Sequence, residues 1–286
     1  MRIYGKRTVA VVLILLIYGL VLGQDDAKKE PKLGWNNNVV GSLNLTQTNF
    51  DNWSQGGENS LTWQLNGNAK FDKNEPKYNW TSTGKIAYGR LKIGNQGSRK
   101  SVDEIRLGTV YTYKLDKDVN PYASATGETQ FSKGYDYSLT PPLAISNFMD
   151  PGYFTQSVGL EYSPGENFDT RLGAALRETI TNKYNQYTDN PNTPKIEKTK
   201  TEAGVESVTD FSFQLAQNML LTSNLRMFSN LKAINQVVLR WDNILSAKVA
   251  KYADVNFNFQ IFYDSTISKK RQMKEALSLG LTYTFM

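Results

Sequence analysis

The sequence of 286 residues contains no histidine and no cysteine. Without histidine there is no Ser-His-Asp or Cys-His nucleophile pair and no histidine-bearing zinc site, and without cysteine there are no thiolate ligands. The chain also has no disulfide bonds, so backbone pairing and burial must stabilise it. Most catalytic classes are therefore excluded and no cofactor is predicted. A hydrolase that uses carboxylates or a Ser-Lys pair remains open.

Long apolar runs are also missing, with the exception of Val9–Leu22 near the start of the chain. This run follows three basic residues and is followed by the small residue Gly23, the pattern of a secretory signal peptide over residues 1–23. The alternative is an N-terminal membrane anchor, although the run is short for a span of about twenty residues. No second long apolar run exists, so any other membrane integration must use strands.

An excess of positive charge is largely lost once this segment is removed. Three of the 33 basic residues and none of the 27 acidic residues lie in the predicted signal peptide, so the net charge falls from +6 to +3. This small excess gives no reason to expect nucleic-acid binding. Residues 24–35 are charged, contain Pro31, and are predicted to form a flexible periplasmic leader before a single domain at 36–286.

A strict alternation of side chains marks the segment Leu61–Asp72. Every odd position is apolar or small and every even position is polar, as in Leu65 and Asn66. A period of two places these two classes on opposite faces of a strand. The same alternation predicts twelve strands at about 38–49, 61–72, 78–91, 102–115, 121–131, 153–163, 168–180, 200–209, 218–229, 236–250, 253–264 and 273–286. Residues 210–217 are predicted to turn helically between two of them.

The lengths of the connections between strands indicate what surrounds the apolar faces. Long connections follow the fifth and seventh strands, whereas Asp116–Asn120 and Pro164–Asn167 are tight turns after even-numbered strands. Short periplasmic turns and long external loops are typical of outer-membrane barrels. We therefore predict an all-β, transmembrane, antiparallel up-and-down barrel of about twelve strands. A soluble β-sandwich is the alternative, but its packed sheets would need bulkier core faces than these.

Aromatic residues gather near the predicted periplasmic rim, as in the interfacial girdles of membrane barrels. They are Tyr78, Trp80, Tyr111, Tyr113, Tyr122, Tyr162, Phe168, Tyr283 and Phe285. The last strand alternates up to Phe285 and resembles the C-terminal signal that the outer-membrane insertion machinery reads, although its aromatic residue is penultimate. That machinery is accordingly an expected partner during biogenesis.

Four short stretches resemble the family known as domain of unknown function 3078. They are Trp53–Ser60, Arg99–Asp103, Ile145–Phe148 and Pro151–Tyr153. The resemblance implies an exported β-barrel protein from bacteria of the Bacteroidota type. It implies no activity, because none is assigned to that family.

Charged residues recur at positions that the alternation directs toward the barrel lumen. Charge is tolerated on membrane strands only where it faces the lumen, where opposite signs pair or meet water. The lumen-facing candidates are Lys85, Glu104, Arg106, Glu128, Glu161, Arg171, Arg177, Glu202, Glu206, Arg226, Arg240 and Asp242. They predict either a salt-bridge network that fills the barrel or a polar path with a small-ligand site, with Arg171 and Arg177 on one wall.

Two predicted external loops are rich in cations. The first holds Lys183, Lys195, Lys198 and Lys200, and the second holds Lys269, Lys270, Arg271 and Lys274. Contact with anionic glycolipid headgroups of the outer leaflet is one interpretation, and ordinary solvated loops are the other.

Three functions are consistent with these features of a monomeric outer-membrane barrel without a metal or cofactor. The first is a narrow pore or a barrel that binds and transports small solutes. The second is an accessory barrel with a plugged lumen, whose external loops around residues 141–153 bind a partner. The third is a barrel-borne hydrolase. The sequence does not decide between the first two.

Overall fold

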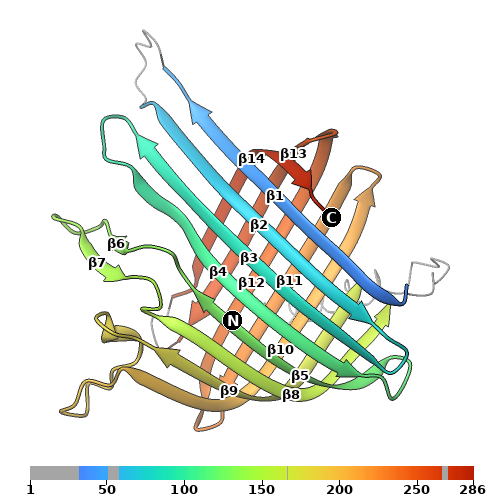
Figure 1. Ribbon diagram of the computed structural model, residues 1–286. Helices are drawn as coiled ribbons and strands as arrows, with labels where there is room; N and C mark the ends of the chain where they lie inside the picture. Colours follow the sequence, from blue (N-terminus) through green and yellow to red (C-terminus); the bar gives the residue numbers. More distant parts are fainter. Residues whose placement is uncertain (1–31, 51–57, 166, 266–269) are drawn as a thin grey trace, which may run out of the picture. The chain divides into compact units, whose positions relative to one another are not determined.

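The computed structural model describes residues 32–50, 58–165, 167–265 and 270–286. Within these residues, twelve antiparallel strands form a closed barrel (Figure 1). The predicted signal peptide lies outside the described residues. No helix in the described part of the chain is long and apolar enough to cross a membrane.

The barrel strands follow one another around the wall in chain order. They are β1 (Gly34–Thr48), β2 (Ser60–Asn74), β3 (Tyr78–Ile93), β4 (Arg99–Tyr113), β5 (Val119–Thr129), β8 (Gly152–Gly165), β9 (Phe168–Ile180), β10 (Thr199–Ala216), β11 (Met219–Asn230), β12 (Ala233–Ala250), β13 (Ala253–Asp264) and β14 (Gln272–Thr284). Pairing of β1 with β14 closes the barrel, with Val40 facing Thr284 and Leu45 facing Leu279. The predicted fold class and strand number are confirmed.

Two elements differ from the sequence predictions. The strand β1 begins at Gly34, so the last residues of the predicted leader are already paired with β2. The helical turn predicted at residues 210–217 is wrong, because β10 continues to Ala216 and pairs with β11. In that extension Phe211 and Phe213 share one face, with their rings stacked at 6.1 Å, so the alternation continues past the point where we ended the strand.

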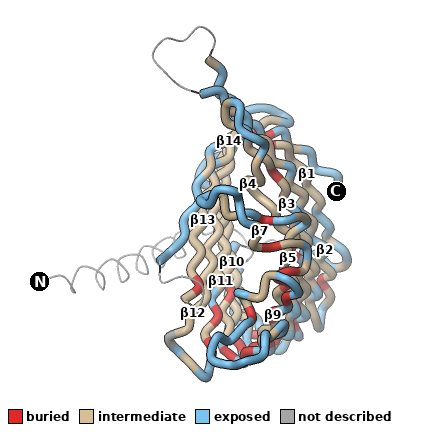
Figure 2. Tube along the Cα trace, turned by 90° about the vertical axis from the view of Figure 1, so that its left-hand side faces the viewer, coloured by how far each residue is buried: buried red, intermediate tan, exposed pale blue. Residues whose placement is uncertain are grey.

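Burial is inverted relative to a soluble protein. Buried residues are scattered along the strands and loops (Figure 2). Among the described residues, five apolar but fourteen polar or charged ones are buried, so the interior is polar. Large apolar side chains instead face outward, including Leu65, Leu107, Val158 and Leu279, each of which is more than half exposed. An outer surface of this kind is stable only against lipid.

The ends of the barrel are unequal. At one end the connections are residues 75–77, 114–118, 217–218 and 251–252, and β8 ends three residues before β9 begins. Both ends of the described chain also lie there, since the amide of Val39 donates to the carbonyl of Met286. The opposite end carries the two longest connections, 130–151 and 181–198. These ends are called the short-turn end and the long-loop end below.

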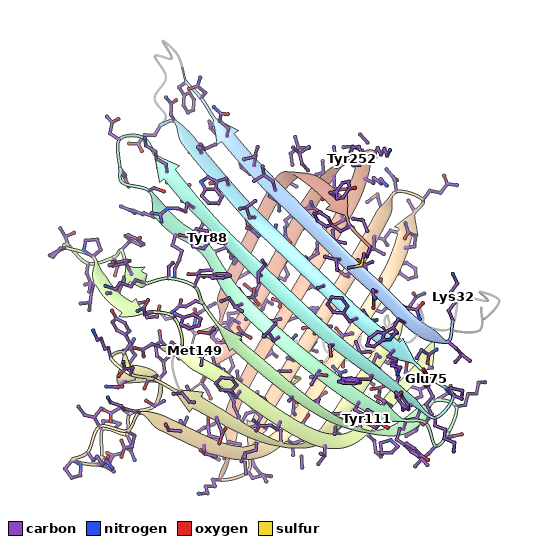
Figure 3. The ribbon with its side chains drawn as sticks, in the orientation of Figure 1. Lys32, Glu75, Tyr88, Tyr111, Met149 and Tyr252 are labelled. Carbon is purple, nitrogen blue, oxygen red and sulfur yellow. The ribbon has the colours of Figure 1, made fainter. Side chains whose placement is uncertain are left out.

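An aromatic rim surrounds the short-turn end. Tyr111 and Glu75 lie near that end, and Met149 lies near the opposite one (Figure 3). Tyr78 stacks on Tyr111 at 5.5 Å, and Tyr283 contacts Phe285 at 4.9 Å.

One predicted member of this girdle does not belong to it. Tyr122 is only 5% exposed and points into the lumen, where its hydroxyl lies within hydrogen-bonding distance of the Ser157 hydroxyl. The physical reason is strand parity, because Tyr122 shares its face of β5 with Ser124 and Glu128. There it packs over Gly173, where an added Cβ would lie 2.7 Å from the phenol oxygen.

The long connection at residues 130–151 folds on itself. It contains a two-stranded sheet of β6 (Gly134–Asp136) and β7 (Leu143–Ser146), which the sequence analysis did not predict. The connection at 181–198 contains a short 3-10 helix, η1 (Asn185–Tyr187). Farther along, the Thr193 hydroxyl and the amide of Asn190 donate hydrogen bonds to the Glu197 carboxylate and hold its pKa below the ordinary value.

Asp150 joins these two connections. Its buried carboxylate accepts hydrogen bonds from the amides of Asn182 at 2.9 Å and Lys183 at 2.8 Å. The side chain of Gln186 also donates to the carbonyl of Ile145 at 2.7 Å. Because a carboxylate that accepts backbone N–H groups forms strong hydrogen bonds, the two loops act as one platform.

The two faces of β2 predict opposite results for neighbouring substitutions. Leu65→Arg places a charge in lipid and costs about 2 to 4 kcal/mol, whereas Asn66→Arg adds a charge to a polar lumen. We expect Leu65→Arg to lower the yield of folded, heat-modifiable barrel strongly and Asn66→Arg to leave it nearly unchanged. Equal losses would contradict the assignment of the faces, and a larger loss at Asn66 would invert it.

Removing the Asp150 carboxylate, which joins the two long connections, should loosen the long-loop end without unfolding the barrel. We expect Asp150→Ala to make residues 181–198 more sensitive to trypsin, because three of the lysines in that loop would no longer be held close to the barrel. The control is Asp136→Ala, since the Asp136 carboxylate accepts hydrogen bonds from Ser138, two residues away in the same loop. Similar digestion of both variants would show that Asp150 does not hold the loops together.

Candidate functional site

Charged side chains of β3, β4 and β5 meet at the middle of the barrel. The Lys85 ammonium lies 3.1 Å from Glu104 Oε2, and Arg106 Nη2 lies 2.6 Å from Glu104 Oε1. Arg106 Nε also donates to Glu128 at 3.1 Å. These pairs lie within β4 or between neighbouring strands, so strand alternation and cross-strand register are enough to place them together.

The same carboxylates are reached from the opposite wall. Arg240 of β12 pairs with Glu104 at 2.9 Å and also with Glu128. From β4, Arg106 Nη1 in turn lies 3.6 Å from Asp242 of β12. Since β12 and β4 lie on opposite sides of the ring of strands, these contacts cross the lumen.

We call this group the lumen network and define it by residues Lys85, Glu104, Arg106, Glu128, Arg240 and Asp242. Its central side chains are shielded from solvent, with 8% of Arg106 and 12% of Glu104 exposed. Gln260 donates to Asp242, and Arg226 donates to Asn224 at 2.9 Å next to the network. Because its ion pairs join opposite walls, the network narrows the lumen at this level.

The lumen near the short-turn end is mainly acidic. Arg171 lies 3.9 Å from Asp169 and 3.7 Å from Asp210, and its guanidinium carbon is 5.9 Å from the Tyr122 ring centroid. Glu161 accepts a hydrogen bond from Thr112 at 2.8 Å. Together with Glu206 on the same face of β10, the carboxylates outnumber Arg171. This level of the lumen favours cations.

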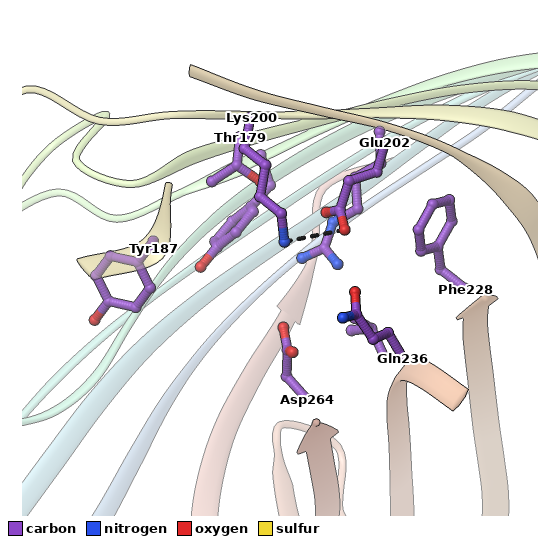
Figure 4. Close-up of a pocket in the computed structure, with 10 residues that line it drawn as sticks. Thr179, Tyr187, Lys200, Glu202, Phe228, Gln236 and Asp264 are labelled. Carbon is purple, nitrogen blue, oxygen red and sulfur yellow. Dashed lines mark ion pairs between the residues drawn. The ribbon is translucent and has the colours of Figure 1, made fainter. Parts of the chain in front are cut away.

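A pocket opens in the lumen wall near the long-loop end (Figure 4). Strands β8 to β13 and the loop after β9 supply its lining. The lining residues are Tyr153, Arg177, Thr179, Tyr187, Lys200, Glu202, Phe228, Gln236, Val238 and Asp264. We call it the mouth pocket.

Both signs of charge lie in the mouth pocket. Lys200 pairs with Glu202 at 3.0 Å, and Asn230 donates to the same carboxylate at 2.9 Å. The Arg177 guanidinium lies 5.2 Å from the Tyr153 ring centroid and 5.8 Å from that of Phe228. Aromatic faces attract a cation and orient it without neutralising its charge.

The twelve sequence candidates fall into these three levels. Lys85, Glu104, Arg106, Glu128, Arg240 and Asp242 form the lumen network and Arg226 adjoins it. Glu161, Arg171 and Glu206 lie toward the short-turn end, and Arg177 and Glu202 line the mouth pocket. Arg171 and Arg177 share one wall, β9, but belong to different sites.

Sequence reasoning missed several members of these groups. Asp210 lay in the segment wrongly predicted as helical, and Asp169 shares the parity of Arg171, a signal that was present. Lys200 and Lys274 were assigned to external cationic loops. Lys200 instead pairs with Glu202 inside the barrel mouth, and Lys274 reaches across the mouth to the carbonyl of Ser101 at 3.1 Å.

No group of three potential metal-binding side chains occurs among the described residues. Most of the predicted loop around Trp53 lies outside the described residues. Lys269 of the second cationic loop also lies outside them.

Comparison with known sequences gives one family match. Residues 45–135 match the family described as "Protein of unknown function (DUF3078)". The resemblance predicted from sequence is confirmed over this part of the chain, which includes Arg99–Asp103 but not Pro151–Tyr153. No curated protein matches the chain.

Solved structures with a similar architecture are outer-membrane barrels. The translocator domain of autotransporter NalP from Neisseria meningitidis is 10% identical with a TM-score of 0.40, and the match covers 98% of this chain and 97% of that one. An outer membrane channel from Pseudomonas putida F1 is also 10% identical with a TM-score of 0.40, covering 91% and 98%. The NanC porin is 6% identical with a TM-score of 0.39, covering 87% and 98%. At these values the comparison concerns the type of fold alone.

Breaking the lumen network should lower the free energy of unfolding more than removing a comparable arginine at the rim. Arg106→Met leaves Glu104 and Glu128 with fewer cations in a shielded site, a change that costs about 3 to 5 kcal/mol. Arg90→Met removes hydrogen bonds to Ser98 at the long-loop end and should cost about 1 kcal/mol or less. Urea unfolding of both variants in detergent micelles measures the difference. Equal stabilities would show that the network adds little to folding.

Proposed function

We propose that the protein is a monomeric outer-membrane barrel that forms a narrow pore for small polar solutes, with the lumen network as its constriction. The apolar outer surface supports a place in lipid, and the aromatic rim supports a membrane interface at the short-turn end. The unequal ends support an orientation in which residues 130–151 and 181–198 are external.

The observation that carries this proposal is the set of ion pairs between opposite walls. Arg240 and Arg106 reach across the lumen to carboxylates, so the narrowest part of the path is bounded by charged side chains of both signs. Side chains exchange rotamers faster than strands move, and they can yield to a hydrated solute that replaces their hydrogen bonds. A constriction of this type selects for small polar molecules.

The same ion pairs support a second candidate function. If they never open, the barrel is a plugged accessory protein, and the platform made by Asp150 and its partner loop is the surface for a partner. The pore is preferred because polar residues continue from the mouth pocket to the acidic level near the other end. We propose no catalytic role for either arrangement.

The environment of the barrel is part of the proposal. The exposed Lys183, Lys195 and Arg271 at the long-loop end are placed to contact anionic glycolipid headgroups. Insertion by the outer-membrane assembly machinery accords with a last strand whose Leu277, Leu279 and Tyr283 all face outward.

Conductance across planar lipid bilayers tests the pore. We expect a small single-channel conductance for the refolded wild-type protein. Arg240→Ala removes the arm that reaches Glu104 and Glu128, so it should raise conductance and shift selectivity toward cations. Lys248→Ala, at the exposed short-turn end of the same strand, is the control and should change neither. If neither the wild-type protein nor Arg240→Ala conducts ions, the plugged barrel would be favoured.

A further inference from the structure

The loop at residues 181–198 lines part of the mouth pocket and is held in place by the contacts given below. Tyr187 reaches the pocket from η1, and its neighbour Gln186 is bonded to Ile145. Asp150 fixes the start of the same loop through the amides of Asn182 and Lys183. These contacts fix the loop from the barrel and from the neighbouring connection, so less conformational entropy is lost when a solute binds beside it.

Arg177 is the distinctive group in this pocket. Lys200, the other cation of the lining, already has Glu202 at 3.0 Å. Within the described part of the chain, the Arg177 side chain makes no ion pair or hydrogen bond, and its guanidinium lies over the rings of Tyr153 and Phe228. A guanidinium with its donors free is suited to bidentate recognition of a carboxylate or phosphate.

The remaining charges limit which anion fits. Glu202 and Asp264 line the same pocket, so a doubly charged phosphate would meet two carboxylates in addition to Arg177. A single carboxylate carries less charge, and hydroxyl or ammonium groups at its other end could donate to Glu202. The Tyr187 hydroxyl, with an ordinary pKa of about 10, is a hydrogen-bond donor at neutral pH. Burial raises this pKa further.

We propose that the mouth pocket binds the carboxylate end of small monocarboxylate solutes that carry hydrogen-bond donors at their other end, such as acidic monosaccharides. Arg177 holds the carboxylate, and the body of the solute lies on the lumen side of the pocket, because the cavity itself, about 10 Å³, is too small for a whole monosaccharide. The aromatic rings of Tyr153 and Phe228 flank Arg177 and provide an apolar surface for the body of the solute. This inference deepens the proposed function and rests on it for the direction of entry, since the pocket lies before the lumen network for a solute from the long-loop end.

Saturation-transfer NMR on the folded protein in detergent micelles tests the site, with D-glucuronate as the probe. D-Glucose is the neutral comparison, because it differs mainly in lacking the carboxylate, and inorganic phosphate is the competing anion. We expect saturation of glucuronate and little of glucose. Arg177→Gln should weaken glucuronate binding about tenfold or more, because a charge-assisted pair is lost. Arg177→Lys should restore part of it.

The matched control is Arg171→Gln, on the same wall of β9 but in the acidic level near the short-turn end. It should bind glucuronate as the wild type does, and a heat-modifiable gel shift should show that every variant is folded. Absence of a glucuronate signal in the wild type, equal binding of glucose, stronger binding of phosphate, or unchanged binding by Arg177→Gln would each overturn the proposal. Binding is measured here independently of conductance. A protein that binds glucuronate but shows no conductance would therefore contradict the proposed pore and support the binding site.

Discussion

Backbone hydrogen bonding in lipid is the constraint on which the rest of this structure depends. Strands can cross a bilayer only if each satisfies its amides through its neighbours, and closure of the sheet through β1 and β14 removes the free edges. Closure then gives every strand one lipid face and one enclosed face. The enclosed face cannot be filled with apolar side chains and also remain a path, so it carries hydrogen-bonded amides, hydroxyls and paired ions.

Much of this arrangement could be predicted from single strands. The bounds of β9 and β13 match the predicted ranges, and alternation was enough to place Arg106 inward and Leu107 outward. Tyr122 was misassigned because aromatic type was given more weight than parity. The pairing of Arg240 with Glu104 could not be predicted, since it depends on the stagger of twelve strands, and the alternation within one strand does not determine that stagger.

The residues that resemble the family have a structural explanation. Lys100 donates to Asp103 at 2.9 Å, to Gln130 at 3.2 Å and to the carbonyl of Ser132 at 2.9 Å. Asp103 in turn accepts from the amides of Phe131 and Ser132. These contacts fix the start of the long connection on the barrel rim, and Asp150 fixes its end. The stretch Arg99–Asp103 therefore anchors the loop platform at the rim and does not line the lumen network or the mouth pocket.

The closure of the barrel has a consequence for the surrounding bilayer. The strands β1 and β2 pair along fifteen residues, but β1 and β14 share six facing pairs, with added bonds between Val39 and the last two residues. At about 3.4 Å per residue this ladder is roughly 20 to 25 Å long, and strand tilt reduces its height further. Lipid beside it must thin to avoid unpaired amides, whereas lipid beside β2 and β3 need not. The protein therefore imposes a lateral gradient of membrane thickness on its own surroundings.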